Sequence, residues 1–289
     1  MPETQVTVRV PATSANIGPG FDTLGIALSL YNWTTVSFDE LDAPLANRMM
    51  LEAAAAFFRA ARRKPVPYSI SVRGNVPVSR GLGSSVTVRL GVVAGLNRLF
   101  GSPLSMERLL EVTTALEGHP DNASPALLGG FVASGMIGSE IRTCRVEVPP
   151  NLKFVAVIPR IEIETRKARK VLPKRVTLHD AVSNVNRVAL ITGALATGDY
   201  EKLRGVFWDT LHQPYRQRLL PPLFDVIRAG EKAGALGGWL SGSGSTIMCV
   251  TLQNARRVAA AMKRTLDRNG LESTAAILTA SNRGMAFEG

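Results

Sequence analysis

The chain has 289 residues, of which 45% are hydrophobic and 20% charged, and its formal net charge is +11. This length allows two domains with a sizeable core, and the apolar fraction is ordinary for a soluble globular protein. The positive charge favours anionic partners such as nucleotides, phosphorylated metabolites or nucleic acid.

Aromatic residues make up only 6% of the chain, which leaves little for stacking on bases. The basic residues are scattered, apart from a modest cluster at residues 166–175. The sequence contains neither zinc-finger spacing nor a basic zipper. A small anionic ligand is therefore favoured over nucleic acid.

The predicted location is the cytoplasm. Cys144 and Cys249 are isolated in apolar surroundings and are expected to be buried and reduced. The first residues have neither a basic head nor an apolar run, so no signal peptide is expected. The most apolar late stretch, residues 123–138, is broken by Pro125 and falls short of the roughly 20 residues that cross a bilayer.

The first half of the chain alternates between strand and helix patterns. Period-two alternation and β-branched residues predict strands at residues 6–10, 26–38 (one strand or two), 68–72, 131–136 and 141–148. Helical periodicity and alanine-rich composition predict helices at residues 49–63, 85–100 and 103–116. Residues 11–20, rich in small and turn-forming residues, predict a loop.

The second half begins after Pro149 and Pro150, which mark the expected domain boundary. Strands are predicted at residues 153–158 and 246–252, and helices at residues 178–197, 219–233 and 255–269. Asn254 and Gly270 are the expected cap and stop of the last helix. The order of elements in this half predicts a compact α+β unit. The expected boundary divides the chain, for which an α+β fold is predicted, into domains at residues 1–150 and 151–289.

The loop at residues 78–85 is the most informative segment. Its glycines and serines lead into an apolar helical stripe, so it predicts a helix N-terminus capped by Ser84 or Ser85. Amides and the helix dipole at such an end favour a polyphosphate. A Walker A motif needs a lysine followed by serine or threonine, and serines follow Gly83 directly here. A simple tight turn before a helix is the alternative.

Three segments rich in glycine, serine and asparagine are spread along the chain. They are PATSANIGPGFD at residues 11–22, GLGSS at residues 81–85 and LSGSG at residues 240–244. Together they resemble the three-motif signature of the GHMP small-molecule kinases.

Three further segments narrow the resemblance to the homoserine kinase family. They are EGHPDNASPA at residues 117–126, TRKAR at residues 165–169 and HQPYR at residues 212–216. The resemblance implies a two-domain GHMP kinase fold, with an N-terminal domain like domain 2 of ribosomal protein S5 and a ferredoxin-like C-terminal domain. It also implies the cofactors ATP and Mg²⁺, with the nucleotide bound by the first domain.

The ATP-binding residues that the resemblance implies are those of the glycine loop, namely Pro77, Val78, Ser79, Arg80, Gly81, Leu82, Gly83, Ser84 and Ser85. By the same resemblance, Ser85 and Glu111 share the Mg²⁺ that bridges the β- and γ-phosphates. Oxygen ligands of this kind suit Mg²⁺. A solvated helix carboxylate is the alternative for Glu111.

A small amino-acid substrate offers a carboxylate, an ammonium group and a reactive hydroxyl. Planar arginines suit the carboxylate, and Arg169 and Arg216 lie in family-like segments. Asp22 and Asn16 could supply oxygens to the ammonium group. Surface solvation is the alternative for the arginines, and local turn formation is the alternative for Asn16 and Asp22.

His119 and Asn122 are close enough in sequence to line one pocket near the substrate hydroxyl. The resemblance adds Thr165 and His212 as substrate-binding residues, although a buried structural histidine is an equal alternative for His212. Asn16, Asp22 and His119 are the candidate catalytic residues. Because phosphoryl transfer has a loose transition state, orientation is assigned to Asp22 and proton acceptance is left open.

The predicted function is ATP-dependent phosphorylation of the side-chain hydroxyl of L-homoserine in threonine biosynthesis. One alternative is another GHMP kinase with a mevalonate- or sugar-type acceptor. The other is a non-catalytic protein on the same scaffold that binds anions or nucleic acid. Residues 39–47 are shorter than the usual adenine loop, which leaves the donor preference open, and a homodimer is also left open.

Overall fold

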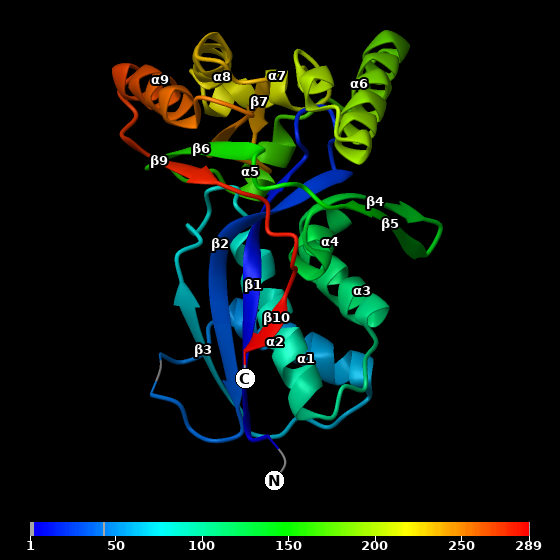
Figure 1. Cartoon of the computed structure of the whole chain (residues 1–289). Helices are drawn as coiled ribbons and strands as arrows, with labels where there is room; N and C mark the ends of the chain where they lie inside the picture. The colour runs from blue at the N-terminus through cyan, green and yellow to red at the C-terminus, as the bar shows by residue number, and fades with distance from the viewer. Residues whose placement is uncertain (1–2, 43, 289) are drawn as a thin grey trace.

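The structure is a computed structural model that describes residues 3–42 and 44–288. Figure 1 shows one β-sheet in the lower part of the molecule and a second in the upper part, with helices packed around both. Met1, Pro2, Ala43 and Gly289 belong to the predicted domain ranges, and Ala43 to the 39–47 segment, but they lie outside the described residues.

The first sheet contains six strands within the described residues, in the order β10-β1-β2-β4-β5, and β3 pairs with β2. The strands are Gln5–Ala15 (β1), Leu24–Ser37 (β2), Ser69–Gly74 (β3), Phe131–Ile137 (β4), Glu140–Val146 (β5) and Ala286–Glu288 (β10). Neighbouring strands are antiparallel. Val6, Val8 and Val10 alternate into the core, as the period of the sequence predicts.

Helices of the first half cover this sheet: Arg48–Ala61 (α1), Ser84–Leu99 (α2), Met106–Glu117 (α3) and Pro120–Leu128 (α4). The α2 helix packs directly on β1 and β2. Gly91 permits this close approach, because a Cβ there would lie 2.3 Å from the hydroxyl oxygen of Thr34. The sheet therefore fixes the position of the N-terminal end of α2.

The second sheet has the order β7-β8-β6-β9. Its strands are Lys153–Pro159 (β6), Gly237–Leu240 (β7), Ile247–Thr251 (β8) and Ser273–Leu278 (β9). Helices Leu223–Lys232 (α8) and Ala255–Arg268 (α9) share a core with it. The remaining helices are Thr165–Lys170 (α5), Leu178–Thr197 (α6), Gln213–Arg216 (α7) and the 3-10 turns Tyr200–Leu203 and Gln217–Leu219.

A single apolar core joins the two sheets. It includes Ile26 and Phe131 from the first sheet, Phe154 and Trp239 from the second, and Ile191 from α6. The Trp239 indole donates to the Ser14 hydroxyl at 3.0 Å, which adds a buried polar link between the two halves. The two halves are thus held together along their shared face.

The end of the chain returns to the first sheet. After β9, the backbone bonds to Ala27 and Ser29 of β2 and to Gly130, the residue before β4. The β10 strand then pairs with β1, with Val8 opposite Phe287. Asn282 accepts from the amide of Val148 and donates to its carbonyl, both at 2.9 Å. The segment after β9 therefore belongs to the first sheet, although a division of the chain at residue 150 would place it with the second half.

Several expectations from the sequence need correction. Residues 11–15 continue β1 past an irregularity at Pro11 instead of forming a loop. The α4 helix was not predicted, because Pro120 and Pro125 disguise it, although Pro120 occupies the first helical position, where proline is tolerated. Cys144 is exposed on β5, whereas Cys249 is buried as expected. Across the described ranges, no helix is long and apolar enough to cross a membrane.

Candidate active site

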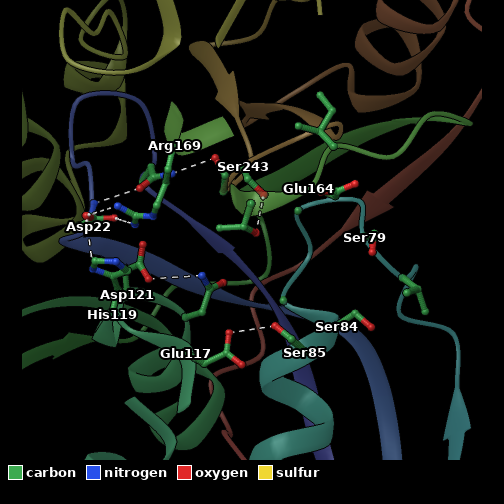
Figure 2. A pocket seen from close by; sticks show the side chains of 18 of the residues that line it. Asp22, Ser79, Ser84, Ser85, Glu117, His119, Asp121, Glu164, Arg169 and Ser243 are labelled. Carbon is green, nitrogen blue, oxygen red and sulfur yellow. Dashed lines mark hydrogen bonds and ion pairs between the residues drawn. The ribbon is translucent and has the colours of Figure 1, made fainter. Parts of the chain in front are cut away.

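A cavity of about 300 Å³ lies between the two halves of the molecule. Figure 2 shows the cavity from close by, with side chains from both halves pointing into it. Its lining includes most of the residues that the sequence singles out, namely Asn16, Asp22, Val78, Ser79, Gly81, Gly83, Ser84, Ser85, His119, Asn122, Thr165, Arg169 and Arg216. Segments far apart in the chain therefore meet at one site.

The three glycine-rich segments are bonded to one another at the edge of this cavity. The Ser241 hydroxyl donates to the Gly81 carbonyl at 2.6 Å, and the Gly242 amide donates to the Ala15 carbonyl at 3.1 Å. The Thr13 amide donates to the Leu82 carbonyl at 3.1 Å. Each segment thus holds the other two in place.

The α2 helix begins at the cavity, but not with the cap that the sequence predicts. Gly83 is the N-cap in a left-handed conformation (φ +69°), and neither Ser84 nor Ser85 caps the helix. The serines occupy the first turn, where helix amides have no partner within the helix and the dipole is positive. This end of α2 has the geometry to bind an anion, and the Ser85 hydroxyl points toward Glu117 (Figure 2).

The carboxylate beside Ser85 belongs to Glu117 and not to Glu111. Ser85 donates to Glu117 at 2.9 Å, and Arg89 donates to the second oxygen of the same carboxylate at 2.7 Å. Glu111 pairs with Arg108 at 2.5 Å on the outer surface and, among the described residues, is not part of the cavity lining. The structure therefore brings Ser85 together with Glu117 and not with Glu111, the residue that the resemblance implied as its partner at Mg²⁺.

Ser85 and Glu117 offer a hydroxyl and a carboxylate oxygen, which is the donor set that Mg²⁺ prefers. Within residues 3–42 and 44–288, no group of three or more His, Cys, Asp or Glu side chains could hold a metal by itself. Mg²⁺ in nucleotide sites commonly takes one or two protein ligands and completes its shell with phosphate oxygens and water. The two residues fit that pattern.

The opposite wall of the cavity carries an ion-paired cluster, labelled in Figure 2. Arg169 donates to the two carboxylate oxygens of Asp22 at 2.7 and 3.3 Å, and the Nδ1 of His119 lies 3.3 Å from the same carboxylate. Burial lowers the pKa of His119, although Asp22 opposes the shift. This wall therefore presents both charge signs to a ligand.

Arg216 is the buried member of this wall, at 2% exposure. It donates to the carbonyls of Gly242 at 2.8 Å and Ala168 at 3.3 Å, and it stacks on the Phe21 ring, as Arg169 also does. Burial and the charge of Arg169 lower the pKa of Arg216 to about 10, so it is still cationic at neutral pH. Its position is set by contacts on several sides.

Two predicted substrate-side residues have a clear structural role as well. Asn16 donates to the Gly242 carbonyl at 2.9 Å and accepts from the Asp22 amide at 3.0 Å. Asn122 accepts from the Thr13 hydroxyl at 2.6 Å. Because both side chains also line the cavity, they connect the loops to whatever the cavity binds.

Some predicted site residues are placed elsewhere. His212 is fully buried behind Arg216 and, within the described part of the chain, does not line the cavity. Among the described residues, the cavity lining also lacks Pro77, Arg80 and Leu82 of the glycine loop. Leu82 is a core side chain, and Arg80 pairs with Glu162 at 3.2 Å.

Asp121 is a lining residue to which the sequence assigned no role. It is 4% exposed, and burial together with the nearby charge of Asp22 raises its pKa to about 7. Such a carboxyl group can accept a proton at physiological pH. Its position in the family-like segment at residues 117–126 was the available signal, and the same segment holds Glu117.

Comparisons with known proteins agree with these features. The family model described as the GHMP kinases N terminal domain matches residues 48–130, and the one described as GHMP kinases C terminal matches residues 193–268. The chain is 41% identical to the protein named homoserine kinase of Moorella thermoacetica over 96% of this chain and 98% of that protein. It is also 41% identical to the protein named homoserine kinase of Clostridium beijerinckii, over 96% of this chain and 97% of that protein.

Solved structures give the same result. The homoserine kinase from Cytophaga hutchinsonii superposes with a TM-score of 0.87 at 26% identity, covering 99% of this chain and 98% of that one. The mevalonate kinase of Methanococcus jannaschii superposes with a TM-score of 0.69 at 14% identity, covering 95% and 98%. The second likeness shows a common fold alone.

Proposed function

Because the chain belongs to the GHMP kinases, and within them to the homoserine kinases, we propose that it transfers the γ-phosphoryl group of ATP to the side-chain hydroxyl of L-homoserine. The product is O-phospho-L-homoserine, an intermediate of threonine biosynthesis. A cytoplasmic location belongs to the same proposal.

One observation carries the proposal. A single cavity has the N-terminal end of α2 on one wall and the Asp22–Arg169 pair with Arg216 on the other. The first wall suits a polyphosphate, and the second suits a small molecule with a carboxylate and an ammonium group. A kinase that phosphorylates an amino acid needs both ligands side by side.

On the nucleotide side, the amides of Gly83, Ser84 and Ser85 are the proposed phosphate contacts. Ser85 and Glu117 would hold Mg²⁺, which neutralises charge on the β- and γ-phosphates when it is bound. Arg89 lies against Glu117 and fixes the orientation of that carboxylate. The chain thus supplies a positively polarised, pre-organised end to the site.

On the acceptor side, Arg169 and Arg216 bind the carboxylate of the amino acid, and Asp22 with Asn16 binds its ammonium group. Asp22 and Arg169 already form an ion pair with the two charge signs that the amino acid also carries. The zwitterion can therefore exchange partners with this pair, and no charge in the site is left buried without a partner. His119, Asn122 and Thr165 complete this wall. Asp121 accepts the proton of the acceptor hydroxyl.

A coupled assay tests the function. ADP formation with ATP and Mg²⁺ is expected to depend on L-homoserine and to be far slower with mevalonate or with a sugar. Turnover of one of those acceptors without turnover of L-homoserine would move the protein elsewhere among the GHMP kinases.

A salt titration of binding to random DNA, set beside ATP binding, tests the non-catalytic alternative. We expect nucleotide binding and no salt-sensitive DNA complex. Salt-sensitive DNA binding without affinity for ATP would contradict the proposal.

A further inference from the structure

Arg216 stands on α7, a helix of only four residues. A single helical turn is not stable by itself in water, because nucleation fixes several residues for very few hydrogen bonds. The residue at its N-cap, His212, provides no side-chain cap. The position of Arg216 therefore depends on groups outside α7.

Asp209 supplies that support. The residue is 1% exposed, and its carboxylate accepts from the backbone amides of Leu211 at 2.8 Å, His212 at 2.8 Å and Gln213 at 2.6 Å. These are amides before and within the first turn of α7, which the helix itself leaves without partners. The carboxylate also accepts from the Asn184 side chain of α6 at 2.8 Å.

The same cluster is tied to the first glycine-rich loop. Asn184 donates to the Pro19 carbonyl at 2.9 Å, and the Nε2 of His212 lies 2.8 Å from the Gly18 carbonyl. A carbonyl can only accept, so Nε2 carries the proton in this contact. The loop that holds Asp22 and the helix that holds Arg216 are thus joined behind the cavity.

His212 passes this constraint on to Arg216. Burial, opposed by Asp209 and reinforced by Arg216, lowers the pKa of His212 to about 4, so the ring is neutral at physiological pH. With the proton on Nε2, the Nδ1 atom accepts from the Arg216 guanidinium at 3.3 Å. One carboxylate therefore orders a chain of contacts that ends at the cavity.

We infer that Asp209 is a positioning residue that sets where the Arg216 guanidinium stands in the acceptor site. Within the described residues, Asp209 does not line the cavity, so it acts only through the groups it holds. The role of Arg216 toward the acceptor rests on the proposed function, whereas the geometric link from Asp209 to Arg216 does not.

The Asp209→Asn substitution is the direct test, because it keeps the shape and changes the hydrogen bonding. Each carboxylate oxygen of Asp209 accepts two hydrogen bonds. The side-chain nitrogen of asparagine, in either position, would face two N–H donors and could accept from neither. Asn97→Asp is the matched control. Asn97 is 4% exposed and bonds both backbone atoms of Leu104, far along α2 from the cavity.

The first measurement needs no substrate. The Arg216 Nε–H signal in a proton–nitrogen NMR spectrum is identified by its absence in Arg216→Lys. We expect this signal to exchange with water at least about tenfold faster in Asp209→Asn, and to be unchanged in Asn97→Asp. An unchanged exchange rate in Asp209→Asn would overturn the inference, whatever the acceptor proves to be.

The second measurement is kinetic. In Asp209→Asn, the KM for L-homoserine should rise between about 10- and 100-fold, while the KM for ATP stays within about twofold. In the double variant, adding Asp209→Asn to Arg216→Ala should not raise the KM for L-homoserine further, because the two residues act as one unit. Equal rises in both KM values, or additive effects, would contradict the inference. Lack of homoserine turnover by the unaltered enzyme would instead contradict the proposed function.

Hydrogen exchange in the unaltered protein decides the matter if Asp209→Asn does not fold. The amides of Leu211, His212 and Gln213 should be protected to the same degree as the buried amides of α6. Exchange at the rate of exposed loop amides would show that the carboxylate does not hold them, and would overturn the inference.

Discussion

At the scale of single residues, the cavity separates two carboxyl groups into different tasks. Asp22 is paired with Arg169 and His119, which suits it to recognition of a cationic group. Asp121 is more deeply buried, and its pKa of about 7 lets it exchange a proton near neutral pH. Groups with such different surroundings are commonly divided between binding and proton transfer.

The Asp121→Asn substitution should lower kcat by roughly 10²-fold, the usual size of a lost general base. The kcat of the unaltered enzyme should fall as the pH drops below about 7, because protonated Asp121 cannot accept a proton. The variant should lack this limb. Steady-state kinetics between about pH 5.5 and 9 measures both. An unchanged limb in the variant would assign it to another group.

The same substitution has an opposite effect on stability. Folding raises the pKa of Asp121 from 3.8 to about 7, so the folded state binds this proton more tightly than the unfolded state. The free energy of unfolding that this proton contributes is fully present below pH 3.8 and is lost as the pH rises to about 7. An asparagine side chain cannot ionise, so the Asp121→Asn variant should be more stable than the parent at pH 8, by on the order of 1–3 kcal/mol, and nearly equal near pH 4. Denaturant unfolding at both pH values checks this.

Glu117 and Glu111 allow a matched test of the proposed Mg²⁺ site, with Glu111 as the control. Glu117→Gln should raise the Mg²⁺ concentration needed for half-maximal activity by about tenfold or more, because it removes the charge beside Ser85. Glu111→Gln, on the outer surface of the same helix, should leave that concentration unchanged. A Mg²⁺ titration of activity distinguishes them, and equal effects would refute the assignment.

At the scale of elements, the site is made by contacts between loops. The α2 helix presents its N-terminal end, but the Gly81–Ser241 and Leu82–Thr13 hydrogen bonds hold the loop before it in place. A Cβ on Gly81 would lie 2.2 Å from the Ser241 carbonyl oxygen, so only glycine allows this approach. Loop packing and nucleotide binding are therefore coupled.

The Gly81→Ala substitution should raise the KM for ATP by about 10- to 100-fold, since the loops must move apart. Gly101→Ala is its control, because Gly101 has a similar φ of +79° but open space around its Cβ position. Both variants should lose about 1–2 kcal/mol of stability from the left-handed backbone. A similar rise in KM in both would show that strain, and not loop packing, is responsible.

At the scale of the whole molecule, the two halves behave as one unit because the core and the chain end join them. Asn282→Ala removes the two hydrogen bonds to Val148 and should destabilise the protein by roughly 1–3 kcal/mol in a single unfolding transition. Asn269→Ala, at the exposed end of α9, should change stability by less than about 0.5 kcal/mol. Two separate transitions in urea would contradict this coupling.

Much of this arrangement could be predicted from the sequence, and the failures have physical causes. Helical periodicity predicts a helix at residues 178–197, which are the bounds of α6. The family-like segments predict that Asp22, Arg169 and Ser85 share one site, and all three line the cavity. Glu111 and Glu117 lie on one helix six positions apart, so they face different directions. Only the docking of α3 decides which one meets Ser85, and no local pattern contains that information.

Burial of His212 and the return of β10 were also beyond local patterns. His212 lies in a recognisable segment, but its burial depends on how the start of α7 packs against the first glycine-rich loop. The β10 strand is three residues long, and its partner is at the opposite end of the sequence. Such pairings are set by tertiary contacts and not by propensity.

The pairing of β10 with β1 has a consequence for biosynthesis. As the ribosome extends the polypeptide, β1 emerges first and β10 only after the whole second sheet has been made. Until then, one edge of the early sheet lacks its neighbour and exposes unsatisfied amides and carbonyls that can recruit strands from other nascent chains. Newly made copies are thus open to this kind of aggregation until β10 has been made and has paired with β1.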